Sequence, residues 1–170
     1  MFWRLFRKPV WTSDLRIEEL RRRGVKIGNS CLIYTMEFST EPYLIEIGDH
    51  VAIAGGVQFI THNGLAAMLR HKHPDIQVFG RIRVGSGTFI GLNSILLPGV
   101  EIGRDCIVGA GSVVRGAIPD ASVVLGNPAM VVGKASVKLA ALETSPHRLD
   151  VFNASPEERR RRIEELFHLT

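Results

Sequence analysis

The segment "VFGRIRVGSGTFIGLNSILLPGVEIGRDCIVGAGSVV" (78–114) decides the fold. Every sixth position from residue 84 onward holds a branched aliphatic residue, and the position four residues further on is small or β-branched. The aliphatic residues are Val84, Ile90, Leu96, Ile102, Val108 and Val114, and the small ones are Thr88, Ser94, Val100, Cys106 and Ser112. A period of six fits neither a helix nor a plain alternating strand. It is typical of a parallel β-helix built from hexapeptides.

The physical basis of the repeat is a narrow triangular coil. Three hexapeptides are expected to close one coil of about 18 residues, with the aliphatic side chain of each pointing inward. Glycine follows four of the six aliphatic residues and permits a tight turn. Stacked coils share strand-to-strand hydrogen bonds at about 4.8 Å. The repeat residues are therefore scaffold, and Cys31 and Cys106, at small inward positions, are predicted to be buried thiols.

The repeat divides the chain into three parts. Residues 1–24 form an N-terminal segment with a short helix over 12–23, and residues 25–133 form the hexapeptide domain, to which the repeat extends in weaker form. Residues 134–170 form a connector and a C-terminal helix, whose capping box begins at Ser155. The predicted fold class is all-β, a parallel β-helix with short N-terminal and C-terminal helices.

Composition narrows the class of protein. A chain of 170 residues with 45% hydrophobic and 22% charged residues is typical of a single globular domain. Its net charge of +4 comes mainly from arginine runs in the predicted helices, which lie beside acidic residues and lack the aromatics that nucleic-acid binding needs. We therefore expect no nucleic-acid partner.

The protein is predicted to be cytoplasmic. No apolar run approaches the roughly 18–20 residues that span a bilayer. Two cysteines are too few for a disulfide scaffold and favour a reducing compartment. Residues 1–11 interleave aromatic and basic side chains. This segment either makes a peripheral membrane contact or covers the end of a core or a subunit contact.

The sixfold repeat is interrupted at "FITHNG" (59–64), and His62 lies in this interruption. The strict count fails until Val84, so residues 60–83 are predicted to leave the coil as a loop. Loops on rigid scaffolds are where binding and catalytic residues concentrate. His62 is therefore the first candidate for a catalytic residue.

A second break, at residues 34–46, contains Glu41 one coil earlier. With a coil of about 18 residues, Glu41 is expected above the corner from which His62 departs, within hydrogen-bond reach. A histidine with an acidic partner is a common general base near neutral pH. The alternative is structural: His62 lines a turn and Glu41 caps one.

The whole of 25–133 resembles the hexapeptide-repeat acyltransferases with a left-handed β-helix. It is most similar to the galactoside, maltose and xenobiotic O-acetyltransferase branch, and within it to polysaccharide-biosynthesis acetyltransferases. The repeat is specific for the fold, whereas the histidine loop and the later glycine motifs are more specific for the chemistry. The motifs that carry the resemblance are "EPYLIEIGDHVAIAGGVQFITHNG" (41–64), "IGLNSILLPGVEIG" (90–103), "VGAGSVV" (108–114) and "GNPAMVV" (126–132).

The resemblance implies an acetyl-CoA-dependent enzyme that works as a homotrimer without a metal. Acetyl-CoA, the cosubstrate, is expected in a groove between neighbouring subunits. A loop histidine, matched by His62, removes the proton from a sugar hydroxyl, which attacks the thioester directly. Glu41 is carried over as the residue that orients the histidine. The expected role is O-acetylation in surface polysaccharide or glycolipid biosynthesis.

The resemblance also assigns residues to the two substrates. Leu92 and Asn93, in "IGLN", and Ala110, in "GAG", match positions where the backbone meets the pantetheine arm, since a coil corner offers free amides. Asn63 follows the histidine, where aspartate is common, and is expected beside the acceptor. Arg70 suits an acidic or phosphate-bearing acceptor. A solvated loop is the alternative reading of the basic run that Arg70 begins.

The positions near the CoA phosphates depart from the family. Arg115 and Gly116 stand where relatives often have Thr-Lys, and Met130 stands where they often carry a basic residue. Arg115 and Lys134 are the predicted substitutes, because phosphate binding needs cationic donors.

Three other functions fit the same fold. One is N-acetylation of an amino-sugar nucleotide, with the same groove and a different acceptor. Another is a carbonic anhydrase-like zinc enzyme, which needs three converging histidines. Its candidates do not have a fitting spacing; they are His50, His62, His71 and His73. The last is a non-catalytic trimeric scaffold, in which these residues would be idle.

Overall fold

The computed structural model describes residues 12–169, so the segment 1–11 predicted to touch a membrane or a subunit lies outside the described residues. Contacts within the chain divide it into two compact units, residues 1–135 and residues 136–170. Each unit is described by itself. No helix within residues 12–169 is long and apolar enough to cross a membrane.

The first unit is built from three sheets of short strands. Sheet A has the order β1 (Lys26–Ile27), β3 (Ile45–Ile47), β6 (Ile82–Val84), β9 (Glu101–Ile102) and β12 (Ala117–Ile118). Sheet B has the order β14 (Ala129–Lys134), β13 (Ser122–Gly126), β10 (Ile107–Val108), β7 (Phe89–Ile90), β4 (Ala52–Ile53) and β2 (Leu32–Ile33). Sheet C has the order β11 (Val113–Val114), β8 (Ile95–Leu96) and β5 (Gln58–Phe59).

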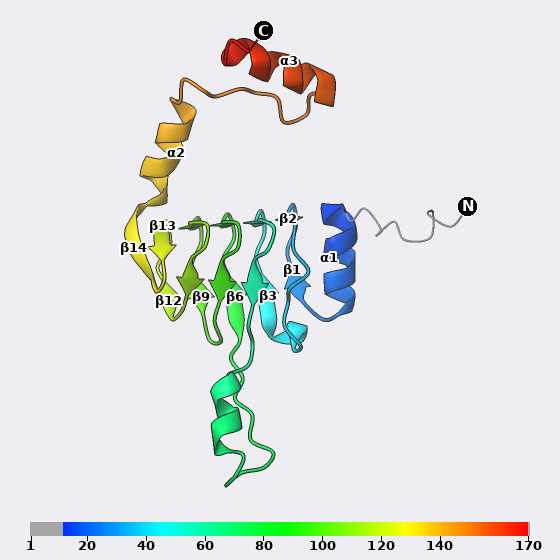
Figure 1. Cartoon of the computed structure of the whole chain (residues 1–170), viewed down its shortest axis with the longest axis vertical. Coiled ribbons are helices and arrows are strands. Elements are labelled where there is room, and N and C mark those ends of the chain that lie inside the picture. The colour runs from blue at the N-terminus through cyan, green and yellow to red at the C-terminus, as the bar shows by residue number, and fades with distance from the viewer. Residues whose placement is uncertain (1–11, 170) are drawn as a thin grey trace, which may run out of the picture. The chain divides into compact units, whose positions relative to one another are not determined.

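From β3 to β13 successive strands visit the three sheets in rotation, so the chain winds in three-sided coils that lie side by side in Figure 1. The strands of adjacent coils pair in parallel, and β13 and β14 are the one antiparallel strand pair within residues 12–169. In the middle of the stack Arg83 pairs with Glu101, a step of 18 residues, as the repeat predicts. An earlier step is longer, since Lys26 pairs with Glu46.

The interior consists of three aliphatic rows, one from each sheet. All six aliphatic residues of the sixfold count are at most 3% exposed, and so are Thr88, Ser94, Val100, Cys106 and Ser112. Both cysteines are free and buried, as predicted. Burial also raises the pKa of the Cys106 thiol. The pattern of parallel strands around a filled interior therefore follows directly from the hexapeptide repeat.

The predicted loop leaves the coil between β5 and β6 and projects away from the stack in Figure 1. It contains the 3-10 helix η3 (Gly64–Leu69), and its two ends meet where His62 bridges Phe79. The sixfold repeat predicted a loop that ends at residue 83. The loop ends two residues earlier, because β6 begins at Ile82. Ile82 points inward and is fully buried, although it stands outside the sixfold count.

The predicted N-terminal helix is α1 (Ser13–Arg22), which packs on β1 and β2. Thr12 caps it by accepting a hydrogen bond from the N–H of Leu15, and Ile17 is among its buried residues. The second break in the rhythm contains the short 3-10 helix η2 (Pro42–Leu44).

The second unit contains most of α2 (Ala135–Glu143) and the C-terminal helix α3 (Pro156–Leu166). Ser155 caps α3 by accepting from the N–H of Glu158 at 3.1 Å, as the capping box predicts. Helix α2 was not predicted from the sequence. Its alanine and leucine residues favour a helix, but its apolar side chains, such as Leu139 and Leu142, are exposed and form no buried stripe that a pattern would reveal.

Candidate functional site

His62 and Glu41 lie together at the corner where the loop leaves the coil. The imidazole Nδ1 of His62 is 3.1 Å from Oε2 of Glu41. The His62 side chain is 45% exposed, whereas that of Glu41 is 16% exposed. The proximity expected from the coil spacing is thus present. The catalytic roles of the two residues stay a prediction at this point.

The Glu41 carboxylate is held by three donors. Thr40 Oγ1 donates to Oε1 and Thr61 Oγ1 donates to Oε2, each at 2.7 Å, in addition to the contact with His62. These contacts, led by the Thr40 and Thr61 hydroxyls, lower the pKa of Glu41 from 4.5 to about 2. Glu41 is therefore an anion throughout the neutral range. An anion at Nδ1 favours the tautomer that carries its proton there.

The hydroxyls of Thr61 and Ser39 form a pair next to this carboxylate. Thr61 is fully buried, and its Oγ1 lies 2.8 Å from Ser39 Oγ. The N–H of Thr61 also donates to Ser39 Oγ, at 3.2 Å. A hydroxyl has one proton, so with the Thr61 proton directed at Glu41, Ser39 donates to Thr61. The sequence analysis missed Thr40 and Thr61, although Thr40 directly precedes Glu41 and Thr61 directly precedes His62 in the chain.

A pocket of about 480 Å³ opens beside this pair. Glu41, His62, Asn63 and Arg70 all line it, so the structure brings together the predicted catalytic and acceptor residues. The remaining wall comes from Thr40, Gly64, Ala66, Ala67, Gln77 and Val78. Asn63 has a local task as well, because its Oδ1 accepts from the N–H of Leu65 and caps η3.

The predicted pantetheine positions share one edge of the coil, between sheets B and C. Leu92 and Ala110 occupy equivalent corners of successive coils, linked by a 2.8 Å hydrogen bond from the N–H of Gly111 to the carbonyl of Leu92. Asn93 follows in the left-handed region, with φ of 56°. Within residues 12–169 the backbone N–H groups of Leu92 and Ala110 have no hydrogen-bond partner. Both amides are thus available to an extended, amide-bearing ligand.

The other predicted cofactor residues are not gathered in one place within the chain. Arg115 and Gly116 follow β11, at the corner between sheets C and A. Met130 and Lys134 lie in β14 and pair with opposite ends of β13. A single subunit therefore does not bring Arg115 and Lys134 together around one group of phosphates.

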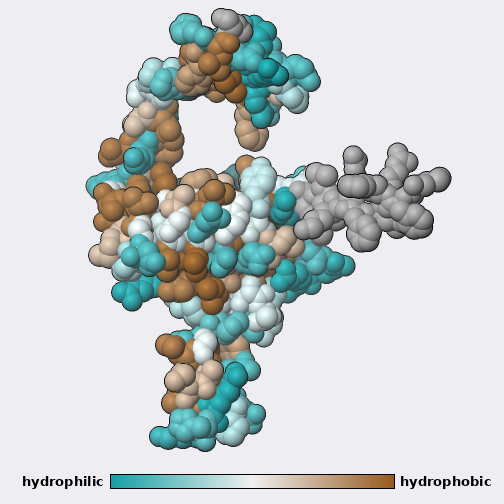
Figure 2. All heavy atoms as spheres, in the orientation of Figure 1, coloured by the Kyte–Doolittle hydropathy of each residue, from teal (hydrophilic) through white to brown (hydrophobic). Residues whose placement is uncertain are grey.

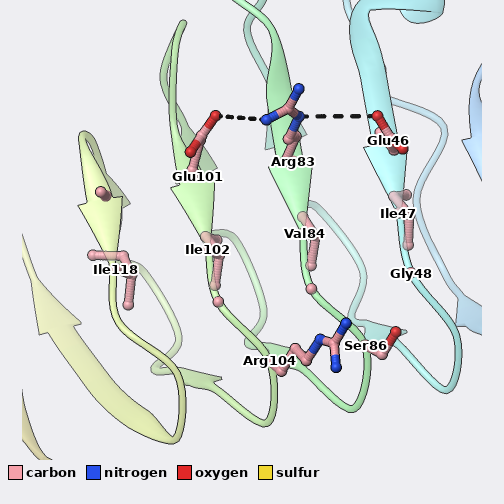
Figure 3. Close-up of a pocket in the computed structure, with 13 residues that line it drawn as sticks. Glu46, Ile47, Gly48, Arg83, Val84, Ser86, Glu101, Ile102, Arg104 and Ile118 are labelled. Carbon is pink, nitrogen blue, oxygen red and sulfur yellow. Dashed lines mark hydrogen bonds and ion pairs between the residues drawn. The ribbon is translucent and has the colours of Figure 1, made fainter.

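A second hollow, of about 410 Å³, lies on the outer face of sheet A, and Figure 3 shows its lining. Arg83 lies between two carboxylates there, 3.1 Å from Glu101 and 4.0 Å from Glu46. Arg81 also pairs with Glu46, at 3.2 Å. These charges satisfy one another across neighbouring coils, which suits a solvent-facing surface better than a reacting site.

The histidines proposed for zinc were His50, His62, His71 and His73. In the part of the chain that the structure describes, residues 12–169, no group of three or more His, Cys, Asp or Glu side chains is placed to hold a metal ion.

Comparison with known proteins gives the class. Residues 81–115 match the family model of the hexapeptide repeat of succinyl-transferase. The chain is 46% identical over 129 residues to protein CapG of Staphylococcus aureus, which covers 74% of each chain. The hexapeptide-repeat-containing acetyltransferase VCA0836 of Vibrio cholerae matches with a TM-score of 0.58 and 29% identity, over 66% of this chain and 63% of that one.

Two further structures bear on the ligands. VCA0836 has also been solved in complex with acetyl-CoA, with a TM-score of 0.57 and 28% identity over 66% of this chain and 61% of that one. A maltose O-acetyltransferase from Clostridium difficile 630 matches with a TM-score of 0.54 and 28% identity, over 71% of this chain and 75% of that one. The chain belongs to the hexapeptide-repeat acetyltransferases.

Proposed function

We propose that this enzyme transfers the acetyl group of acetyl-CoA to a sugar hydroxyl, with His62 as the general base. The observation that carries the proposal is the pairing of His62 with an ionised Glu41, 3.1 Å away, in a pocket beside the coil. The similarity to a maltose O-acetyltransferase supports a sugar acceptor. A role in surface polysaccharide or glycolipid biosynthesis, in the cytoplasm, belongs to the same proposal.

In this proposal each imidazole nitrogen of His62 has one task. With the proton on Nδ1 directed at Glu41, the lone pair of Nε2 accepts the proton of the acceptor hydroxyl. The hydroxyl oxygen then forms a bond to the thioester carbonyl carbon, and the carbon–sulfur bond breaks. The proton on Nε2 passes to the departing CoA thiolate, which returns the imidazole to its neutral form. Glu41 stabilises the imidazolium between these steps.

The proposal includes a left-handed coil and a homotrimer. Both are typical of the family, and the outer face of sheet B supports the second. Its outward row pairs coil to coil and is apolar, consisting of Leu32, Ala52, Phe89 and Ile107. Leu32 is 38% exposed and Phe89 45% exposed, whereas the same row on sheet A is mostly charged. An apolar face of this kind is expected to be covered by a neighbouring subunit.

His62→Ala tests the proposed base. General-base help is worth ~10²–10⁴-fold, so we expect kcat for acetyl transfer to fall by that factor while acetyl-CoA still binds. His50→Asn is the matched control, because His50 lies outside the pocket and asparagine tolerates its left-handed backbone at φ of 56°. Acetyl transfer by His62→Ala at the parental rate would remove the assignment. A screen with hydroxyl and amino sugars separates O-acetylation from N-acetylation.

A further inference from the structure

Arg70 stands on the wall of the pocket that contains His62. It ends the 3-10 helix η3, where its N–H donates to the carbonyl of Ala67 at 3.3 Å. This hydrogen bond holds the backbone at Arg70. The bridge between His62 and Phe79 holds the two ends of the loop together. Arg70 and His62 are therefore held on walls of one cavity by the same loop.

Two polar groups that line the pocket, the Glu41 carboxylate and Asn63 Oδ1, already have partners. Glu41 accepts from Thr40, Thr61 and His62, and Asn63 Oδ1 accepts from the N–H of Leu65. In contrast, the Arg70 guanidinium has no hydrogen bond or ion pair within residues 12–169. A guanidinium has five N–H donors in a planar fork, so Arg70 is the cation of the pocket wall whose donors remain to be used.

No carboxylate pairs with Arg70 within residues 12–169, and Glu41, which also lines the pocket, is already held by Thr40, Thr61 and His62. Asp75 is the only acidic residue between His62 and Arg81, and Asp75 does not line the pocket. Arg81 is already paired with Glu46 on sheet A. Figure 2 shows hydrophilic residues gathered at the outer end of the projecting loop. A ligand that enters the pocket therefore meets a free guanidinium whose counter-charge the loop does not provide.

We propose that Arg70 binds an anionic group of the acceptor sugar, either the carboxylate of a uronic acid or the phosphate of an activated sugar. This inference rests on the proposed O-acetylation at the same site. Both groups match the planar fork of arginine, which binds them through two parallel hydrogen bonds. The anion fixes the sugar at one side of the pocket, and a hydroxyl of the same sugar faces Nε2 of His62.

Matched acceptors test this inference with the full chain. Acetyl transfer is measured with methyl β-glucuronide, glucose 1-phosphate and the neutral methyl β-glucoside, with the parent, Arg70→Gln, Arg70→Lys and Lys72→Gln. Lys72 is the control because it carries the same charge in the same loop and does not line the pocket. The parent is expected to prefer one anionic acceptor by about 10- to 100-fold in kcat/KM, the range for charge-assisted hydrogen bonds. The preferred anion distinguishes a carboxylate from a phosphate.

Arg70→Gln is expected to remove this preference through a higher KM for the anionic sugar. Arg70→Lys should keep part of the preference, and Lys72→Gln should stay within about twofold of the parent, because long-range surface charge is screened. Equal use of anionic and neutral sugars by the parent would overturn the inference. So would an Arg70→Gln variant that slows both alike through kcat.

Titration of the same three sugars without acetyl-CoA separates this inference from the proposed function. Binding of an anionic sugar that Arg70→Gln abolishes, in a protein that acetylates none of them, would support the anion site and count against O-acetylation. Acetylation that depends on His62 but is indifferent to Arg70 and to acceptor charge would keep the proposed function and overturn the anion site.

Discussion

Glu41→Gln isolates the charge of the partner of His62 with little change in shape. In the parent, Glu41 Oε2 lies 3.1 Å from the imidazole and 2.7 Å from Thr61 Oγ1. Glutamine keeps an oxygen that one of these donors can use, but it removes the negative charge. The imidazolium that forms during proton transfer then loses its counter-charge, so the transition state is destabilised more than the ground state.

The magnitude follows from the exposure of the pair. A hydrogen bond to a charged group is worth about 1.5–3 kcal/mol, and solvent screens this pair because His62 is 45% exposed. The lower part of the range, about 1.5–2 kcal/mol, corresponds to a fall of about 10- to 30-fold in kcat. Glu46→Gln is the matched control. Glu46 is also paired, with Arg81 and Arg83, but lies on the outer face of sheet A.

The charge of Glu41 does not change over the assay range. Since the pKa of Glu41 is about 2, its carboxylate is ionised throughout the neutral range. The fall in kcat of Glu41→Gln should therefore appear at any neutral pH chosen for the assay. An unchanged kcat would refute the role of Glu41 as the partner of the base.

Other predictions concern the support of the site and the scaffold. Thr61→Val should lower kcat about 3- to 10-fold by removing one net hydrogen bond of roughly 1 kcal/mol, and Thr61→Ser should restore it; acetyl-CoA binding, measured by calorimetry, should not change. Because the pKa of Glu41 is lowered from 4.5 to about 2, its ionised form stabilises the fold above pH 4.5 and loses this effect toward pH 2. The stability gap between the parent and Glu41→Gln in urea unfolding should therefore shrink over that window; a constant gap would contradict it. Gly85→Ala places Cβ 2.5 Å from the backbone carbon of Gly103, so thermal unfolding should show a loss of about 1–3 kcal/mol, whereas Gly133→Ala meets nothing within 4 Å and should be near neutral.

The scaffold could be predicted because the repeat encodes it locally. Each hexapeptide specifies its own inward residue and its own corner, so a sixfold count is sufficient to place Val84 through Val114 in the interior. The count fails where its assumptions fail. Ile82 is buried without belonging to it, and α2 (Ala135–Glu143) has good helix formers but no buried stripe. Patterns of burial cannot reveal an element that buries almost nothing.

The site was predictable in part, for a related reason. The coil converts a separation in sequence into a position in space, so two interruptions one coil apart place Glu41 and His62 at the same corner. The coil says nothing about which side-chain atoms then meet. The contacts of Thr40 and Thr61 with Glu41 depend on rotamers and on a coil step longer than the 18 residues of the regular repeat, since Leu32 pairs with Ala52.

The longer step has a chemical consequence. In the regular repeat the small inward positions hold Thr88, Ser94, Val100, Cys106 and Ser112, none of them charged. At this corner the chain carries extra residues, and the backbone there reaches the left-handed region at Ser39, with φ of 51°. Thr61 is buried there and contacts Ser39, while Glu41 is turned toward His62. The scaffold thus tolerates a carboxylate beside its core because the hydroxyls of Thr40 and Thr61 satisfy that carboxylate, and the same two hydroxyls keep it ionised for the histidine.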